Sequence, residues 1–443
     1  MLTEMLKKIP YLLNNPGIAR YAGSIYWMFL DRGSRILITL VVSGFMLRYL
    51  GPVSFGKLST AKSFVTIFQP IGVFGLDSLL IVYLVRFSRN SHRILASATA
   101  LRLAGGFVVW CLTLGLCFFV FPDRKDLWPL IAIIGCMPLL QSFETVDSFY
   151  QARVNMRPII IVKQIGFIAS NVLRILMSVL GGTLFGFAAL VPLEFLLSSS
   201  GLYVLAKKDQ RVRFRESFSL GNFKMLVSRG WPVMFSGLAA TVNLYADQVL
   251  LGHFMGDKAV GLYSAAVQLS STTYYIPWIL VPALFPAIIN AKKNSLPAYL
   301  DRVSALLSML TWMSVIIAIF TAFTSELIIS MLFGQQFSES SGILRLHIWS
   351  IVPFFQMIAT NYCLVVEGEK RLLLKIAVGA AILNIALNIL LIPKFGIYGA
   401  IYATIVSYAL PSLILPLLSK KSRFLSILCW KAFLLPVRLV GKK

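Results

Sequence analysis

Apolar residues fall in long blocks along most of the chain, and short polar stretches separate the blocks. A block of about 20 apolar residues crosses a hydrocarbon core of roughly 30 Å as one α-helix. The pattern predicts an all-α polytopic membrane protein with about twelve transmembrane spans. Their approximate bounds are 24–48, 63–85, 97–121, 128–150, 159–180, 184–206, 231–252, 261–289, 303–323, 343–366, 372–392 and 397–418.

Composition supports this prediction. Hydrophobic residues make up 58% of the 443 residues and charged residues only 13%, whereas roughly a quarter of the residues in soluble domains are charged. So few charges do not cover a soluble protein of this size with a polar surface. Residues 1–23 are predicted not to be a cleavable signal, because the apolar run after them is too long and lacks a clear cleavage site.

The chain carries 41 Lys and Arg against 17 Asp and Glu, a formal charge of +24. In a soluble protein this surplus would suggest nucleic acid, but cytoplasmic loops of membrane proteins are also enriched in basic residues. One set of alternate loops, with both termini, holds 27 of the basic residues, the other set holds 6, and 8 lie in or at the ends of spans. This bias predicts both termini in the cytoplasm and requires no nucleic-acid partner.

The longest basic loop, 207–230, divides the chain near its middle. The predicted organisation is an N-terminal six-helix bundle at 1–206, this cytoplasmic linker, and a C-terminal six-helix bundle at 231–418. Residues 419–443 are predicted to form a basic cytoplasmic tail, an amphipathic helix on the membrane surface.

The two halves also resemble each other. Residues 49–51 with Gly56 recur as 254–256 with Gly261, at an offset of 205, and residues 185–186 recur as 395–396, at an offset of 210. Matches at nearly one offset indicate parallel repeats related by an axis along the membrane normal. We therefore expect two six-helix bundles around a central cavity, as in an alternating-access transporter.

Several polar side chains lie inside the predicted spans. A charged residue at a span centre costs about 2.5–3.5 kcal/mol on insertion scales, so it usually faces a bundle interior or a watery cavity. Lys163 and Arg174 share one face of a helix that has no carboxylate. Several cations with few compensating acids favour an anionic cargo such as a phosphate or diphosphate. The predicted cavity residues are Arg32, Arg35, Lys163, Arg174, Asn243 and Gln268.

Four carboxylates are candidates for a gate or for ion coupling, namely Asp77, Glu144, Asp147 and Asp247. Simpler interpretations remain open. Asp31 and Arg35 have the spacing of a structural intrahelical pair, and Arg102 and Lys375 are close enough to the interface to extend into it. Aromatic residues of spans seven and eight fit either sugar stacking or helix packing; they are Tyr245, Tyr263, Tyr274, Tyr275 and Trp278.

The sequence lacks the residue patterns typical of disulfides, metal sites and ATP hydrolysis. The five cysteines show no paired spacing and the three histidines are far apart, so neither disulfides nor a metal site is predicted. Residues 51–57 begin like a phosphate-binding loop, but Leu58 stands where that motif needs Ser or Thr. We predict no cofactor and no enzymatic activity.

Three segments resemble one family. Arg48-Tyr49-Leu50-Gly51-Pro52 with Phe55-Gly56 is similar to the signature after the first span of Wzx-type polysaccharide flippases, in the multidrug/oligosaccharidyl-lipid/polysaccharide exporter superfamily. The run from Asp247 through residues 260–266 and the turn at 392–400 also resemble that family. The likeness covers most of the chain, and the family motifs do not mark substrate contacts.

The resemblance implies a multi-pass flippase of the bacterial inner membrane. Its cargo would be undecaprenyl-pyrophosphate-linked oligosaccharide repeat units of the O-antigen type, and its partners would be this lipid-linked cargo, membrane lipids, and a polymerase and chain-length regulator of the same pathway. Flipping of capsule or exopolysaccharide units and multidrug or cation antiport remain alternatives. A membrane glycosyltransferase or polymerase is disfavoured, because the predicted outer loops are short.

Overall fold

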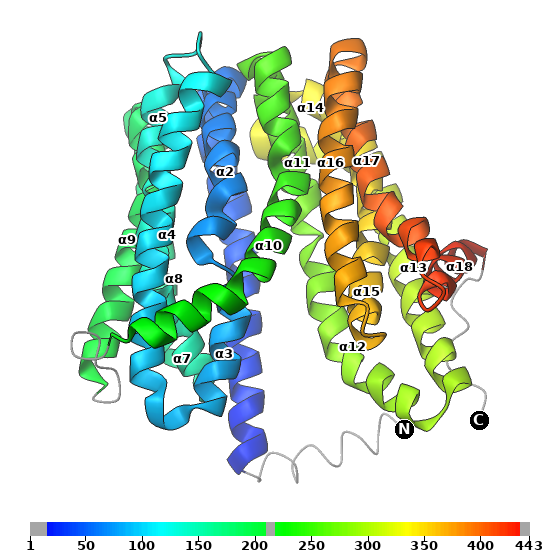
Figure 1. The fold of residues 1–443 in the computed structure, drawn as a ribbon. Helices are drawn as coiled ribbons and strands as arrows, with labels where there is room; N and C mark the ends of the chain where they lie inside the picture. The colour runs from blue at the N-terminus through cyan, green and yellow to red at the C-terminus, as the bar shows by residue number, and fades with distance from the viewer. Residues whose placement is uncertain (1–15, 210–217, 435–443) are drawn as a thin grey trace. The chain divides into compact units, whose positions relative to one another are not determined.

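The protein is described by a computed structural model that covers residues 16–209 and 218–434. Every regular element in these two ranges is helical (Figure 1), which confirms the predicted all-α class. Ten stretches of the described chain are long and apolar enough to cross a membrane. The predicted cytoplasmic termini stay a prediction, because 1–15 and 435–443 lie outside the described residues.

The helices follow the predicted order. The α-helices are α2 (Pro16–Val73), α3 (Leu76–Arg86), α4 (Ser91–Val120), α5 (Leu127–Gly135), α6 (Met137–Leu140), α7 (Thr145–Gln151), α8 (Arg157–Leu180), α9 (Leu184–Lys208), α10 (Leu220–Phe254), α11 (Asp257–Thr272), α12 (Tyr275–Asn294), α13 (Leu296–Phe333), α14 (Glu339–His347), α15 (Ile351–Val366), α16 (Lys370–Phe395), α17 (Ile397–Leu413) and α18 (Arg423–Leu434). Short 3-10 helices are η1 (Ser88–Asn90), η2 (Gln141–Glu144), η3 (Gln335–Phe337), η4 (Ile348–Ser350) and η5 (Leu415–Leu418).

The first two predicted spans are joined in α2, which is interrupted at Gly51 (φ 68°, ψ 173°). Gly256 at the same place in the second half has nearly the same backbone conformation (φ 79°, ψ −176°). This region of φ/ψ space is open almost only to glycine. The matching geometry supports the internal duplication that the sequence predicts.

Two predicted spans are not continuous helices. The second breaks at Phe74 and Gly75, which both have positive φ, so Asp77 lies in the first turn of α3. The fourth is divided into α5, α6, η2 and α7, and Pro138 near its break lacks a backbone donor. Hydropathy alone does not reveal such breaks, because the residues on both sides remain apolar.

Contacts divide the chain into two compact units. Unit 1 comprises the described parts of 1–49 and 68–238, and unit 2 comprises those of 50–67 and 239–443. Residues 50–67, which the sequence places in the N-terminal half, thus pack with the C-terminal half, and the first part of α10 packs with unit 1. Residues 210–217 of the predicted linker lie outside the described ranges.

Each unit has its own apolar core. In unit 1 one core cluster includes Leu76, Leu95 and Phe149, and in unit 2 another includes Leu310, Phe355 and Leu364. The tail helix α18 buries Leu425, Cys429 and Ala432, one face of an amphipathic helix, in the unit 2 core. Ile427, Trp430 and Leu434 of the same helix are exposed, so the position of this tail on the membrane surface stays a prediction.

Candidate functional site

One charged network in unit 1 joins helices α2, α8 and α9. Arg35 pairs with Asp31 one turn earlier on α2, with Nε 2.9 Å from Oδ1. Its Nη1 also lies 3.7 Å from Oε1 of Glu194 on α9. Arg174 on α8 contacts the second oxygen of the same carboxylate, Nη2 to Oε2 at 3.2 Å. Glu194 is thus shared by two arginines from two other helices.

A tight turn brings Arg174 and Glu194 together. Gly181 ends α8 in the left-handed conformation, and the Thr183 side chain accepts a hydrogen bond from the Gly186 amide at the start of α9. Such caps satisfy backbone groups that a helix end leaves free. The two helices then run side by side (Figure 1), so residues about two to three turns from the connection can meet.

A second network lies near the beginning of α8. The Lys163 ammonium is 2.7 Å from Oδ2 of Asp147 and 3.2 Å from Oε1 of Glu144. The next residue, Gln164, donates through Nε2 to Oδ1 of Asp31 at 2.9 Å. Consecutive residues of α8 therefore contact the two networks.

Arg102 and Asp77 form a third pair in unit 1. The Arg102 side chain is only 2% exposed, whereas that of Asp77 is 74% exposed. Nε and Nη1 of Arg102 are buried without a hydrogen-bond partner among the described residues. The sequence interpretation that Arg102 extends to the interface is therefore wrong: its guanidinium lies inside the unit, against Asp77.

These pairs change the predicted electrostatics of unit 1. The sequence suggested few compensating acids, but Arg35, Lys163, Arg174 and Arg102 each contact a carboxylate. The acids come from neighbouring helices, which a search along one helix does not examine. Arg32 is half-buried on α2, and no hydrogen bond or ion pair among the described residues joins it to the networks.

Glu194 is the residue that sequence reasoning missed. It is the one acidic residue of predicted span 184–206, and a lone carboxylate in an apolar run was a usable signal.

In unit 2 the polar centre is Asp247 on α10. Its Oδ2 accepts hydrogen bonds from the Tyr263 hydroxyl at 2.6 Å and from the Thr404 hydroxyl at 2.7 Å. Its Oδ1 is buried without a partner among the described residues. Three helices, α10, α11 and α17, thus meet at one buried carboxylate.

Further polar groups surround this centre. The Tyr263 ring meets the His347 ring edge-on at 5.7 Å between centroids, and Nδ1 of His347 is hydrogen-bonded to Ser270 at 2.9 Å. On α16, Asn384 donates to Ser407 at 3.1 Å, and Ser407 in turn donates to the carbonyl of Thr404. This arrangement could hold a proton or a small cation, since buried carboxylates, hydroxyls and amides are suitable ligands for either.

The other predicted residues of unit 2 are not hydrogen-bonded to Asp247. Asn243, one turn earlier on α10, is buried and its Oδ1 has no hydrogen-bond partner in the described chain. Gln268 is half-buried on α11. Tyr274 is buried and stacks on Phe354 with ring centroids 3.9 Å apart, so packing accounts for that aromatic residue.

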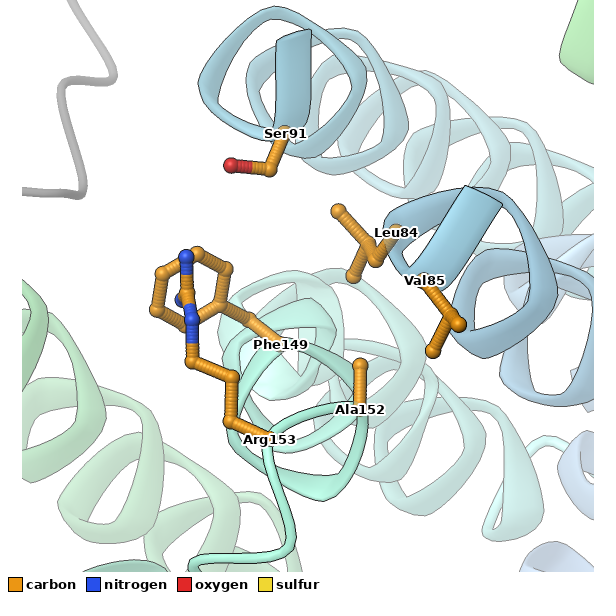
Figure 2. A pocket seen from close by; sticks show the side chains of 6 residues that line it. All are labelled: Leu84, Val85, Ser91, Phe149, Ala152 and Arg153. Carbon is orange, nitrogen blue, oxygen red and sulfur yellow. The ribbon is translucent and has the colours of Figure 1, made fainter. Parts of the chain in front are cut away.

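Two cavities open within unit 1. One, of about 180 Å³, is lined by Leu84, Val85, Ser91, Phe149, Ala152 and Arg153. Figure 2 shows the Arg153 guanidinium lying over the Phe149 ring, 3.5 Å from its centroid. The other cavity, of about 270 Å³, follows the break between α2 and α3 and includes Asp77 in its lining. No predicted cavity residue lines either of them. Within the described residues no group of three or more His, Cys, Asp or Glu is arranged to hold a metal ion.

The fold matches solved transporter structures. An inward-facing multidrug resistance MATE family transporter of the MOP superfamily superposes with a TM-score of 0.69 and 14% identity, over 90% of this chain and 98% of the other. The lipid II flippase MurJ in its inward closed conformation gives 0.66 and 15%, over 95% and 93%. At these identities the likeness establishes the fold alone.

Two sequence relatives are named as transport proteins. The succinoglycan biosynthesis transport protein ExoT of Rhizobium meliloti (strain 1021) is 24% identical over 56% of this chain, and the matched region spans 49% of its own length. A Shigella dysenteriae protein named as an O-antigen transporter is 20% identical over 87% of this chain and 97% of its own.

A family model described as polysaccharide biosynthesis protein matches residues 23–292. This region is more than half of the chain and includes the motif at residues 48–56 and the run from Asp247 to residue 266. It also contains the charged networks of unit 1. The chain belongs to the polysaccharide biosynthesis protein family.

Proposed function

We propose that the protein is a flippase that moves undecaprenyl-pyrophosphate-linked oligosaccharide repeat units across the bacterial inner membrane by alternating access. The family and the named relatives support glycan transport. The observation that most supports this proposal is that two half-buried arginines, Arg35 and Arg174, lie within apolar spans. Guanidinium groups bind phosphate oxygens in a bidentate manner, so these side chains suit a diphosphate headgroup while the lipid tail remains in the bilayer.

Transport rather than catalysis is the activity that we propose. The residues required for ATP hydrolysis are missing from the segment at 51–58. The energy for net movement would come from an ion gradient or from consumption of the product outside. Asp247, buried between Tyr263 and Thr404, is our candidate for the coupling carboxylate, and Asp77, Glu144 and Asp147 are candidates for gating.

A second function is export of small organic cations, which we propose because a structure of the same fold is named as a multidrug resistance transporter. The observation in its favour is that carboxylates compensate the cations of unit 1. The saccharide proposal explains better why two arginines lie within the spans, because a cationic cargo would need only the carboxylates of unit 1.

We assign the O-antigen pathway first, because the relative matched over nearly its whole length is named as an O-antigen transporter. ExoT, matched over half its length, is named for succinoglycan, so an exopolysaccharide or capsule unit is the alternative cargo. The expected partners are membrane lipids, the lipid-linked cargo, and a polymerase with its chain-length regulator.

The test is deletion of the gene, with lipid-linked oligosaccharide measured separately in each leaflet. We expect the unit to accumulate on the cytoplasmic side, and the surface polysaccharide that disappears identifies the pathway. Normal delivery to the outer leaflet in a strain without a redundant flippase contradicts the proposal. Export of a cationic dye by purified protein in liposomes, without movement of the lipid-linked unit, would support the second function instead.

A further inference from the structure

Glu194 differs from the other carboxylate of its network in how it is held. Asp31 is bound by Arg35 on its own helix and by the Gln164 amide at 2.9 Å. Glu194 is contacted by the two arginines alone within the described chain, and its distances of 3.7 and 3.2 Å are longer. Glu194 is therefore the carboxylate that can be exchanged, whereas Asp31 is fixed in place.

The charges of this network balance in the structure. Arg35 and Arg174 carry two positive charges, and Asp31 and Glu194 carry two negative charges. A cation left alone inside a membrane span is costly, and breaking a buried ion pair leaves the remaining charge uncompensated. Glu194 therefore stabilises the two arginines as long as no other anion is present.

A diphosphate can bind the same two guanidinium groups more strongly than a carboxylate can. It offers more oxygens and more negative charge than the two oxygens of Glu194, and each guanidinium presents a planar fork of donors. The four side chains are 15–27% exposed, so none of them is fully enclosed by the protein.

We propose that Glu194 is an internal counterion that holds Arg35 and Arg174 in the empty protein and that the phosphate groups of the cargo displace. This inference rests on the proposed function and adds a residue to it. Loading frees the carboxylate from the arginines, and its return to them expels the cargo. Glu194 thus acts through the arginines, as a positioning residue that limits affinity and promotes release.

The test measures binding and transport separately in purified full-length protein. Farnesyl diphosphate is the soluble probe, and farnesol controls for binding of the lipid tail. We expect Glu194→Gln to lower the Kd for farnesyl diphosphate about tenfold or more, because a competing negative charge is removed. Arg174→Gln should raise the Kd. Transport of lipid-linked saccharide by Glu194→Gln should be slower in spite of tighter binding.

Glu194→Asp keeps the charge on a shorter side chain and provides a variant that preserves the pairing if Glu194→Gln does not fold. Its Kd should lie between those of wild type and Glu194→Gln. Glu339→Gln removes a carboxylate from the exposed pair with Lys258 and should leave binding unchanged. Folded Glu194 variants that bind the probe no better than wild type overturn the displacement, while the flippase proposal stands if wild type still moves the saccharide. Absence of saccharide transport by wild type overturns the flippase proposal itself.

Discussion

Gly56 and Gly261 face each other in unit 2, each where a side chain would overlap the backbone of the other helix. A Cβ atom on Gly56 would lie 1.9 Å from the carbonyl oxygen of Asp257, and one on Gly261 would lie 1.9 Å from that of Pro52. The contact is reciprocal, because 257 and 261 are the positions 205 residues after 52 and 56. The glycine that ends the motif at residues 48–56 is thus a helix-packing residue within unit 2, consistent with the motif not marking substrate contacts.

Gly56→Ala or Gly261→Ala should therefore separate α2 from α11. Overpacking of a close contact typically costs about 1–3 kcal/mol, and here the obstacle is backbone, which moves less easily than a side chain. We expect a lower unfolding temperature in detergent and a smaller amount of protein in the membrane. Gly379→Ala is the matched control, because nothing lies within 4 Å of the added atom. Equal stability of all three variants would contradict the packing role.

Lys163→Gln and Arg174→Gln should lower saccharide transport while the protein remains in the membrane in normal amounts. Each substitution removes a cation that the cargo anion would contact, and each leaves a carboxylate without its partner. Surface polysaccharide at matched low expression is the measurement. Lys163→Arg keeps the charge and serves as control. Unchanged polysaccharide in both glutamine variants would remove these residues from the proposed site.

Asp77→Asn should destabilise unit 1, because the buried Arg102 then loses the carboxylate that it contacts directly. An unsatisfied buried charged group costs at least about 1–3 kcal/mol, although the exposure of Asp77 lets water replace part of the interaction. Thermal unfolding of the purified variant measures the loss. Arg102→Met combined with Asp77→Asn should recover part of the stability, since no buried charge is left unpaired. If the double variant is less stable than both single variants, the pair is not what determines stability here.

Asp247→Asn should abolish the dependence of transport on an ion gradient. The substitution keeps the size of the side chain but removes the charge that a proton or cation would neutralise. The initial rate of saccharide transport in liposomes, with and without an imposed gradient, is the measurement. Tyr263→Phe removes one donor to Oδ2 and retains the carboxylate, so it should weaken transport but preserve the gradient dependence. A gradient response in Asp247→Asn equal to that of wild type excludes this residue as the coupling group.

Hydropathy was sufficient to predict the all-helical class, because a long apolar block has few other stable forms in a membrane. Glycine spacing was sufficient to predict the matching backbone conformations of Gly51 and Gly256, and the intrahelical pair of Asp31 and Arg35 follows from a separation of one turn. These features depend on residues that are close in sequence or equivalent by repeat.

Contacts between helices were not predictable in the same way. The pairing of Arg174 with Glu194 depends on which faces of α8 and α9 meet, and the packing of 50–67 with unit 2 depends on tertiary contacts that a span count does not contain. The burial of Arg102 escaped prediction for a related reason: its acid partner, Asp77, follows a helix break that hydropathy does not show.

The reciprocal glycine contact has a consequence for the origin of the chain. Two identical subunits that associate across a two-fold axis make the same kind of contact, because each residue pair then occurs twice with the subunits exchanged. In a half-length chain, one glycine and the backbone carbonyl four residues before it would supply both sides of this contact when two copies associate. Fusion of two such copies would make this subunit interface an intramolecular one, in which a substitution at either glycine affects only one side of the contact.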